Sequence, residues 1–262
     1  MKNLSHRLIA TAFFVLMATS WTRGASSAAP APAADATRGK VVYERYCLSC
    51  HGEDGDGRGE GGDWIFPRPR DFRQGMFKWR STPSGALPTV LDLDKTITDG
   101  VYGTHMPTWY AIGERSRHDV IAYIQTFSPR WRAEEIPAPI AIPPEPAATG
   151  DSIAAGKALF DKLECAKCHG DTGRGDGPSS HDLRDDWGDP IAAADLTAGH
   201  FKCGGSPADI YRVFMTGLNG TPMPSYVDSI KPEEAWQLVH YIRSLHTGPD
   251  LPDVGPAGRP IH

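Results

Sequence analysis

Cys47-Leu-Ser-Cys-His51 and Cys165-Ala-Lys-Cys-His169 are the two stretches of this 262-residue sequence from which its fold class can be inferred. Each has two cysteines three residues apart, followed at once by a histidine. On a helical turn, side chains at positions i, i+3 and i+4 project from one side, so the two thiols and the imidazole of each stretch can face a single group. Four of the five cysteines belong to these stretches, and only Cys203 stands apart.

A Cys-x-x-Cys pair by itself has other uses, namely a redox dithiol, half of a zinc site or a disulfide. A thioredoxin-like dithiol needs a strand-helix-strand context, and a zinc site needs two more ligands at finger-like spacing; neither pattern surrounds these pairs. The added histidine makes the motif the attachment signature of c-type haem, so we expect two covalently bound haem c groups, each with its iron. The thiols and imidazoles expected to hold them are Cys47, Cys50, His51, Cys165, Cys168 and His169.

The similarity between the two halves of the chain extends well beyond these motifs, which indicates an internal repeat. Three further blocks match: Gly-Lys-x-x-aromatic before the motif, Asp-(Phe or Leu)-x-x-Gly-x-Phe-Lys after it, and Gly-x-x-Gly-Thr-x-Met-Pro-x-aromatic farther on. The matched ranges are 39–43 with 156–160, 71–78 with 195–202, and 100–109 with 217–226.

Met106 and Met223 are the candidates for the sixth position on each iron, which a methionine thioether commonly takes in electron-transfer haem sites. Both lie in the third matched block, between Gly-Thr and Pro, at nearly equal distances after His51 and His169. The glycines allow tight turns and the prolines stiffen the backbone, so these loops are suited to deliver sulfur to a fixed place. The predicted metal ligands are therefore His51 with Met106, and His169 with Met223.

Other residues compete for that sixth position. His105 has a proline as its counterpart in the second copy, and Met76 and His200 occupy equivalent positions without being the same residue type. Equivalent ligand roles are therefore not expected of them. Met215 lies in an apolar helical stretch and is assigned to the core.

Cys203 aligns with Trp79 of the first copy and is the main asymmetry of the repeat. As a thiolate it would displace Met223 and turn an electron carrier into an enzyme of sulfur chemistry; a buried, unreactive thiol is the alternative. Several side chains near this position either meet haem propionates or take ordinary places on the surface and in the core. They are Lys78, Trp79, Arg80 and Lys202.

Each copy closes with a helical pattern, because apolar residues recur at i, i+3, i+4 and i+7 from Val120 and from Leu238. Pro232 and the two glutamates after it resemble the first turn of a helix. The Gly- and Asp-rich loops at 52–57 and 170–177 lack the ligand order of a calcium-binding EF-hand, so we interpret them as loops that wrap a haem. Neither copy has an alternating strand pattern, and the expected fold class is all-α, with two small domains in tandem.

Composition changes along the chain set the expected boundaries. A basic start, an apolar run too short to span a bilayer and a set of small residues indicate a secretory signal peptide. Prolines mark a semi-rigid linker in the middle and a frayed tail at the end. The expected segments are a signal peptide at 1–28, a first domain at 36–130, a linker at 131–150, a second domain at 151–247 and a flexible tail at 248–262.

The chain has 27 basic and 32 acidic side chains, a formal net charge of -5. This mildly acidic balance argues against nucleic-acid binding and suits weak docking to basic patches on redox proteins. The signal predicts export to the periplasm, with membrane association only through a partner. Because no cysteine follows the expected cleavage region near Ala28, a lipid anchor is not supported; an uncleaved signal that tethers the protein is the alternative.

On these residues the chain resembles class I c-type cytochromes in tandem. The resemblance covers 36–127 and 151–246 and implies a proximal histidine and a distal methionine on each haem. It also implies that the first and last helices of each copy cross closely at a glycine and pack with an aromatic residue of the last helix, which closes a haem crevice. The glycines and aromatic residues concerned are Gly39 with Tyr123 and Gly156 with Tyr241.

Single-electron transfer is the activity that this resemblance implies. We expect an electron carrier rather than an enzyme, with a terminal oxidase, reductase or dehydrogenase of a respiratory chain as partner, no small-molecule substrate and no catalytic residue. Two alternatives stay open. One is a dihaem enzyme of the thiosulfate-oxidising type that uses Cys203 at the second haem, and the other is the haem subunit of a larger oxidoreductase complex.

Overall fold

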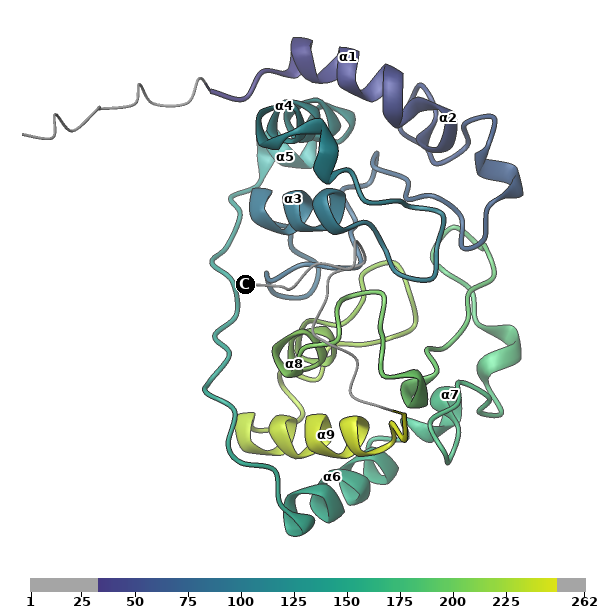
Figure 1. Cartoon of the computed structure of the whole chain (residues 1–262), viewed down its shortest axis with the longest axis vertical. Helices are drawn as coiled ribbons and strands as arrows, with labels where there is room; N and C mark the ends of the chain where they lie inside the picture. Colours follow the sequence, from purple (N-terminus) through teal and green to yellow (C-terminus); the bar gives the residue numbers. More distant parts are fainter. Residues whose placement is uncertain (1–32, 249–262) are drawn as a thin grey trace, which may run out of the picture. The chain divides into compact units, whose positions relative to one another are not determined.

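The computed structural model describes residues 33–248, and these residues are helical, with one isolated β-bridge and no strand (Figure 1). The all-α prediction is therefore confirmed. The expected signal peptide at 1–28 and nearly all of the expected tail at 248–262 lie outside the described residues. The α-helices are α1 (Ala36–Tyr46), α2 (Leu48–His51), α3 (Val90–Asp99), α4 (Glu114–Ile124), α5 (Arg130–Ala133), α6 (Gly150–Lys162), α7 (Ala166–His169), α8 (Pro207–Thr216) and α9 (Pro232–Ser244).

Single 3₁₀ turns connect some of these helices. They are η1 (Gly62–Trp64), η2 (Tyr110–Ile112), η3 (Gln125–Phe127), η4 (Ser180–Asp182) and η5 (Leu196–Ala198). The described part of the chain from Ala34 onward belongs to one compact unit, which holds both copies of the repeat. None of the described helices is long and apolar enough to cross a membrane.

Helices α1 and α4 cross at a glycine in the N-terminal copy (Figure 1). A Cβ atom on Gly39 would overlap the carbonyl oxygen of Asp119, so only glycine allows this approach. One turn later, Tyr43 is 1% exposed and meets the edge of the Tyr123 ring, with 5.2 Å between the ring centroids. The predicted crossing of the first and last helices is confirmed here.

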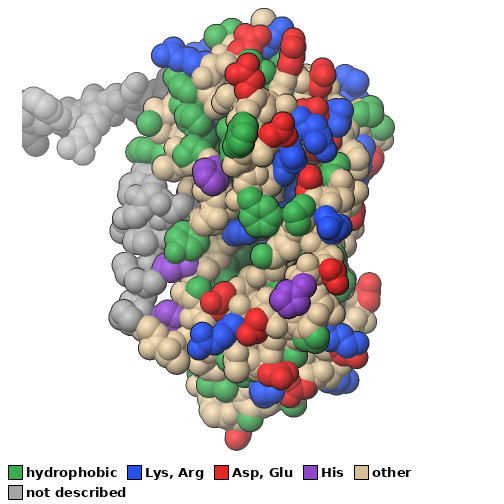
Figure 2. Space-filling model, turned by 90° about the vertical axis from the view of Figure 1, so that its right-hand side faces the viewer, with side chains coloured by type: hydrophobic (Ala, Val, Ile, Leu, Met, Phe, Trp, Pro, Cys, Tyr) green, Lys and Arg blue, Asp and Glu red, His purple; other side chains and the backbone are tan. Residues whose placement is uncertain are grey.

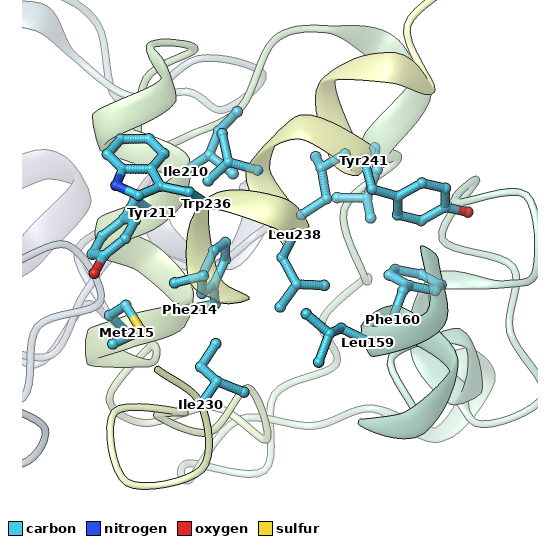
Figure 3. Packing of buried hydrophobic residues seen from close by; sticks show 14 residues of the cluster. Leu159, Phe160, Ile210, Tyr211, Phe214, Met215, Ile230, Trp236, Leu238 and Tyr241 are labelled. Carbon is cyan, nitrogen blue, oxygen red and sulfur yellow. The ribbon is translucent and has the colours of Figure 1, made fainter. Parts of the chain in front are cut away.

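Helices α6 and α9 repeat this crossing in the C-terminal copy. A Cβ atom on Gly156 would overlap the carbonyl oxygen of Gln237, and the rings of Phe160 and Tyr241 lie 5.3 Å apart (Figure 3). Helix α9 begins at Pro232, as predicted, and the carboxylate of its third residue accepts the backbone N–H of the residue before the helix at 2.7 Å. This bond satisfies an N–H group that the helix leaves without a partner.

Each copy has its own hydrophobic core, and fully burying one large apolar side chain contributes about 1.5–3 kcal/mol. The C-terminal core, part of which is drawn in Figure 3, lies between α6, α8 and α9 and includes Met215, which confirms its assignment to the core. The buried residues of the N-terminal core are Tyr43, Phe72, Phe77, Leu93, Ile97, Val120, Ile121 and Ile124.

Helices α3 and α8 are equivalent elements that lead into the two methionine loops. Their N-caps are Thr89 and Ser206, whose side chains accept backbone N–H groups of the first turn. Both helices end at a glycine with positive φ, +70° at Gly100 and +68° at Gly217. A residue with positive φ at this place stops the helix and turns the chain back, which glycine does at little steric cost.

Between the two copies, residues 134–149 have no helix or strand. Helix α5 occupies the start of the stretch expected as linker, and the ring of Trp131 meets that of Phe77 in the N-terminal core at 6.1 Å. Farther on, Ile140 donates its N–H to the carbonyl of Ser81 at 2.8 Å and packs against the C-terminal core. This segment therefore contacts both copies.

Candidate haem sites

The two Cys-x-x-Cys-His stretches form single helical turns, as predicted. Helix α2 follows α1 directly, and the His51 N–H donates to the Cys47 carbonyl at 2.9 Å. Helix α7 has the same bond, from His169 to Cys165, also at 2.9 Å. One turn thus places two thiols and an imidazole on the same side.

In the N-terminal copy, the predicted ligands surround one cavity. It has an empty volume of about 1280 Å³, its open mouth included. The four predicted residues that line it are Cys47, Cys50, His51 and Met106. Most of the remaining wall is apolar and includes Phe72, Phe77, Leu93, Ile97, Val101, Trp109, Ile112, Val120 and Ile124.

At about 1280 Å³ with its mouth included, this cavity is large enough for a bulky, mostly apolar group, and the structure brings all four predicted residues of the first site together around it.

The two predicted proximal histidines are held in the same way. Nδ1 of His51 donates to the carbonyl of Arg70 at 3.1 Å, and Nδ1 of His169 donates to that of Ala194 at 3.0 Å. Since a carbonyl only accepts, each Nδ1 carries the proton and each Nε2 keeps a free lone pair. Burial lowers the pKa of His51 to about 4 and also lowers that of His169, so both rings are neutral at neutral pH and able to bind a metal.

The two methionine loops share one set of internal hydrogen bonds. In each, the methionine carbonyl accepts the N–H of the residue after the helix-ending glycine, at 3.0 Å in the first loop and 3.1 Å in the second. The methionine N–H donates to a threonine hydroxyl two residues earlier, at 3.1 Å and 3.2 Å. The residues that make these bonds are Val101, Thr104 and Met106 in the first loop and Leu218, Thr221 and Met223 in the second.

In the C-terminal copy, Cys165, Met223 and Tyr226 all pack against the hydrophobic core. Burial raises the pKa of the Cys165 thiol to about 11. A thiol of the attachment motif and the predicted distal methionine therefore lie on the same core in this copy as well.

These residues fit a covalently bound haem. All four motif cysteines are free thiols, and the first site combines two thiols, a neutral imidazole nitrogen and a thioether around an apolar cavity. Within residues 33–248, no group of three or more His, Cys, Asp or Glu side chains is arranged to hold a metal ion.

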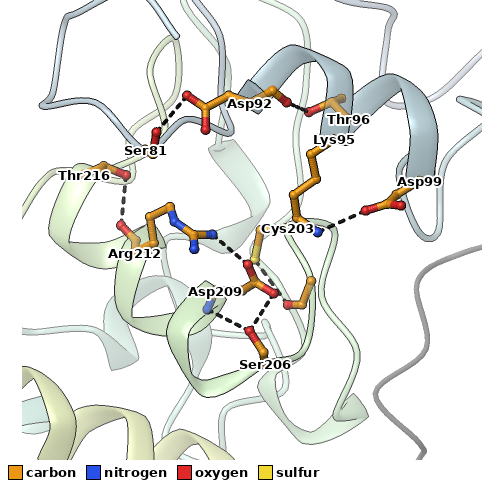
Figure 4. Close-up of polar contacts among 11 residues, drawn as sticks. Ser81, Asp92, Lys95, Thr96, Asp99, Cys203, Ser206, Asp209, Arg212 and Thr216 are labelled. Atoms are coloured by element: carbon orange, nitrogen blue, oxygen red, sulfur yellow. Dashed lines mark hydrogen bonds and ion pairs between the residues drawn. The ribbon is translucent and has the colours of Figure 1, made fainter. Parts of the chain in front are cut away.

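Cys203 is half-buried beside the N-terminal end of α8, close to Asp209 and Ser206 (Figure 4). Its Sγ donates to the carbonyl of Gly204 at 3.5 Å. Burial raises the pKa of the thiol to about 12, so in this environment it is protonated at neutral pH. It lines a cavity that residues of both copies share, together with Lys202.

Sequence reasoning missed the two carbonyls that orient the histidines. Arg70 and Ala194 each stand one residue before the matched aspartate of the second block, so the repeat itself could have identified them as equivalent.

Among the side chains considered as partners of haem propionates, Lys78 and Trp79 line the first cavity. Arg80 lies outside that cavity.

The two copies contact each other close to both methionine loops. The rings of Tyr102 and His200 lie 5.1 Å apart, and Arg70 covers the Trp187 ring at 4.5 Å. The Gly85 N–H donates to the Asn219 side chain at 3.1 Å. Further contacts between the copies are an ion pair of Arg68 with Asp189 and hydrogen bonds from Arg80 to Thr216 and Gly217.

Acidic and basic side chains are interspersed on the face shown in Figure 2, without one large patch of a single sign. This agrees with the modest net charge of -5. A surface of this kind favours docking by shape and local charge pairs over long-range attraction.

A family model for cytochrome c matches the chain twice, over residues 36–128 and 153–246. The protein belongs to the cytochrome c family and has two cytochrome c domains in tandem. Cytochrome c domains imply covalently bound haem c, and the two domains imply two haems.

Two curated relatives are cbb3-type cytochrome c oxidase subunits named FixP. That of Azorhizobium caulinodans is 26% identical over 219 residues, which cover 80% of this chain and 59% of the relative. That of Sinorhizobium medicae is 28% identical over 118 residues, which cover 42% of this chain and 36% of the relative. The matches thus span between about a third and three fifths of these relatives' length.

A solved structure is more similar over a greater share of both chains. It comes from the Kuenenia stuttgartiensis reducing HAO-like protein complex Kustc0457/Kustc0458. The likeness has a TM-score of 0.80 at 43% sequence identity and covers 82% of this chain and 99% of that chain. The similarity therefore includes both cytochrome c domains.

Proposed function

We propose that this protein transfers single electrons between redox proteins through two haems, each held between a histidine and a methionine. The observation that carries the proposal is the first cavity, where Cys47, Cys50, His51 and Met106 surround one apolar space. When bound, haem supplies a reversible one-electron couple of its iron. A methionine ligand raises the reduction potential of such a site, as suits a respiratory electron carrier.

The chain's own residues divide the work at each site. The cysteines would tether the group, and the carbonyls of Arg70 and Ala194 fix the proton on Nδ1 of each histidine, which leaves Nε2 able to bind iron. The hydrogen bonds of each loop fix the backbone of its methionine, and the wall of the first cavity is mostly apolar. A rigid ligand set of this kind needs little rearrangement when the charge of the site changes.

Absorption spectroscopy of the ferric protein tests this ligand assignment. Methionine-ligated ferric haem has a far-red sulfur-to-iron charge-transfer band, and we expect Met106→Ala and Met223→Ala each to remove one share of it. The matched control is Met215→Leu, a volume-conserving change at a core methionine of α8 that should leave the band intact. Retention of the full band in both alanine variants would overturn the assignment.

We further propose that the protein works as a subunit of a larger oxidoreductase complex. The similar solved chain comes from a protein complex, and the curated relatives are oxidase subunits by name. A subunit purified from its native source should remain with a second chain at fixed stoichiometry in gel filtration, even at a salt concentration that screens surface charges. Elution as a single free chain under gentle, low-salt conditions would favour an independent shuttle.

We also propose export to the periplasm, on the basis of the N-terminal sequence pattern. N-terminal sequencing of the mature protein should find a start close to Ala28. A mature chain that still begins at Met1 would contradict cleavage and favour the tethered alternative.

A further inference from the structure

Arg80 is a buried arginine of the first cytochrome c domain whose hydrogen bonds reach the second. Arg80 is 2% exposed, although charged side chains are seldom fully buried without a partner. Nη2 donates to the carbonyl of Thr216 at 2.6 Å, and Nη1 donates to that of Gly217 at 3.2 Å. These partners lie 136 and 137 residues farther along the chain.

The other hydrogen bonds of this guanidinium also go to backbone carbonyls. Nε donates to Pro83 at 3.2 Å and Nη1 to Phe77 at 3.5 Å. No carboxylate among the described residues accepts a hydrogen bond from Arg80; Asp92 acts on its charge from farther away. Burial lowers the pKa of Arg80 to about 10, which leaves the group charged at neutral pH.

The two carbonyls stand where helix α8 ends and the second methionine loop begins. The last carbonyls of a helix lack partners within it and carry its partial negative charge, so a cation there is favourable. Gly217 turns the chain back with φ +68°, and the next residue bonds to the Met223 carbonyl at 3.1 Å. Arg80 therefore holds the base of the loop that carries Met223.

The first methionine loop has no equivalent of this contact. The repeat aligns Arg80 with Gly204, which has no side chain to donate from the second domain. Accordingly, no side chain within residues 33–248 donates to the carbonyls of Asp99 or Gly100 at the end of α3. Only the second loop is held by a guanidinium from the other domain.

We propose that Arg80 is a positioning residue for the second haem. From the first domain, it fixes the loop of the second domain that presents Met223 and thereby strengthens sulfur ligation there. This inference rests on the proposed function, in which Met223 is a haem ligand. Electron transfer at the C-terminal site thus depends on contact between the domains.

Competition with imidazole measures the strength of methionine ligation at one haem at a time. In a Met106→His background, the far-red band reports the Met223 site alone, and in a Met223→His background it reports the Met106 site alone. Arg80→Met should lower the imidazole concentration that bleaches the Met223 band at least about tenfold, the factor expected for one lost hydrogen bond to a charged group. The Met106 site should not change.

Two further variants separate positioning from a general loss of structure. Arg80→Lys keeps the charge and can donate to a nearby carbonyl, so it should restore part of the ligation strength. Arg117→Met is the matched control, because Arg117 is also buried in the first domain but bonds only within it, to Asp94 at 2.8 Å and Tyr110 at 3.4 Å. It should leave the Met223 site unchanged.

Several outcomes would overturn the inference. They are an unchanged Met223 site in both Arg80 variants, an equal loss at both haems, or a loss at the Met106 site alone. If Arg80→Met does not fold, Arg80→Lys decides by the same comparison of the two sites. If the proposed function is wrong and Met223 is not a haem ligand, the Met106→His background shows no far-red band even before Arg80 is changed. That result is distinct from a failure of the Arg80 inference alone.

Discussion

The two methionine loops, 100–109 and 217–226, have the same internal hydrogen bonds but different neighbours. The turn of the second is packed tightly, because a Cβ atom on Gly220 would lie 2.7 Å from the Trp187 ring and 3.2 Å from the Arg70 side chain. The equivalent Gly103 has open space at its Cβ position. The local sequence therefore shapes this loop, while its surroundings determine how firmly it is held.

Alanine at the two equivalent glycines gives the largest expected difference. Both residues have positive φ, +66° at Gly103 and +77° at Gly220, which costs a non-glycine residue about 1–2 kcal/mol. Gly220→Ala must also displace Trp187 or Arg70, at a further cost of about 1–3 kcal/mol. Urea unfolding of both variants, followed by circular dichroism and haem absorbance, measures these losses, and equal losses would show that the crowding around Gly220 relaxes freely.

The helix crossings of the two domains provide a smaller contrast. Asp119 on α4 accepts two hydrogen bonds from Arg38 at 2.7 Å and one from the Asp35 N–H at 2.8 Å, whereas the aligned residue in α9 is the neutral Gln237. Asp119→Asn should destabilise the first domain by about 1–2 kcal/mol at neutral pH. The lower end is favoured because the Arg38 side chain is 42% exposed.

The same pair predicts how the stability of the first domain depends on pH. The hydrogen bond from Arg38 holds the pKa of Asp119 below its usual range. A group with a lowered folded pKa stabilises the protein above its unfolded pKa of about 3.9, and this contribution is lost as the pH falls through the folded value. The free energy of unfolding of wild type should therefore exceed that of Asp119→Asn at neutral pH, and the two values should converge in strong acid. A difference that stays constant with pH would contradict the assignment.

The smallest expected effect concerns Cys203, the counterpart of Trp79. Because its thiol is protonated at neutral pH, Cys203→Ser should leave the haem absorption spectrum unchanged and alter stability by no more than about 0.5–1 kcal/mol. The first haem site, where Trp79 takes the equivalent position, is unchanged in this variant and serves as the internal reference. A shifted spectrum together with loss of thiosulfate turnover would instead support the enzymatic alternative.

Much of each domain could be predicted from the sequence because its determinants are close together in the chain. The attachment turn, the caps of α3 and α8 and the hydrogen bonds of the methionine loops join residues a few positions apart. The helix crossing at Gly39 joins distant residues, yet the repeat and the family resemblance together predicted it. Short-range bonds of this kind form wherever the same residues recur, which is why the repeat was informative.

Two helical domains, two attachment turns and two methionine loops follow from the sequence, since local hydrogen bonds and helical periodicity encode them. Three features emerge only when the chain has folded: Arg70 and Ala194 orient the histidines, residues 134–149 contact both copies, and Arg80 bonds to Thr216. Contacts between residues 136 positions apart carry no local signal. They arise only when two complete domains pack and a buried guanidinium must find acceptors.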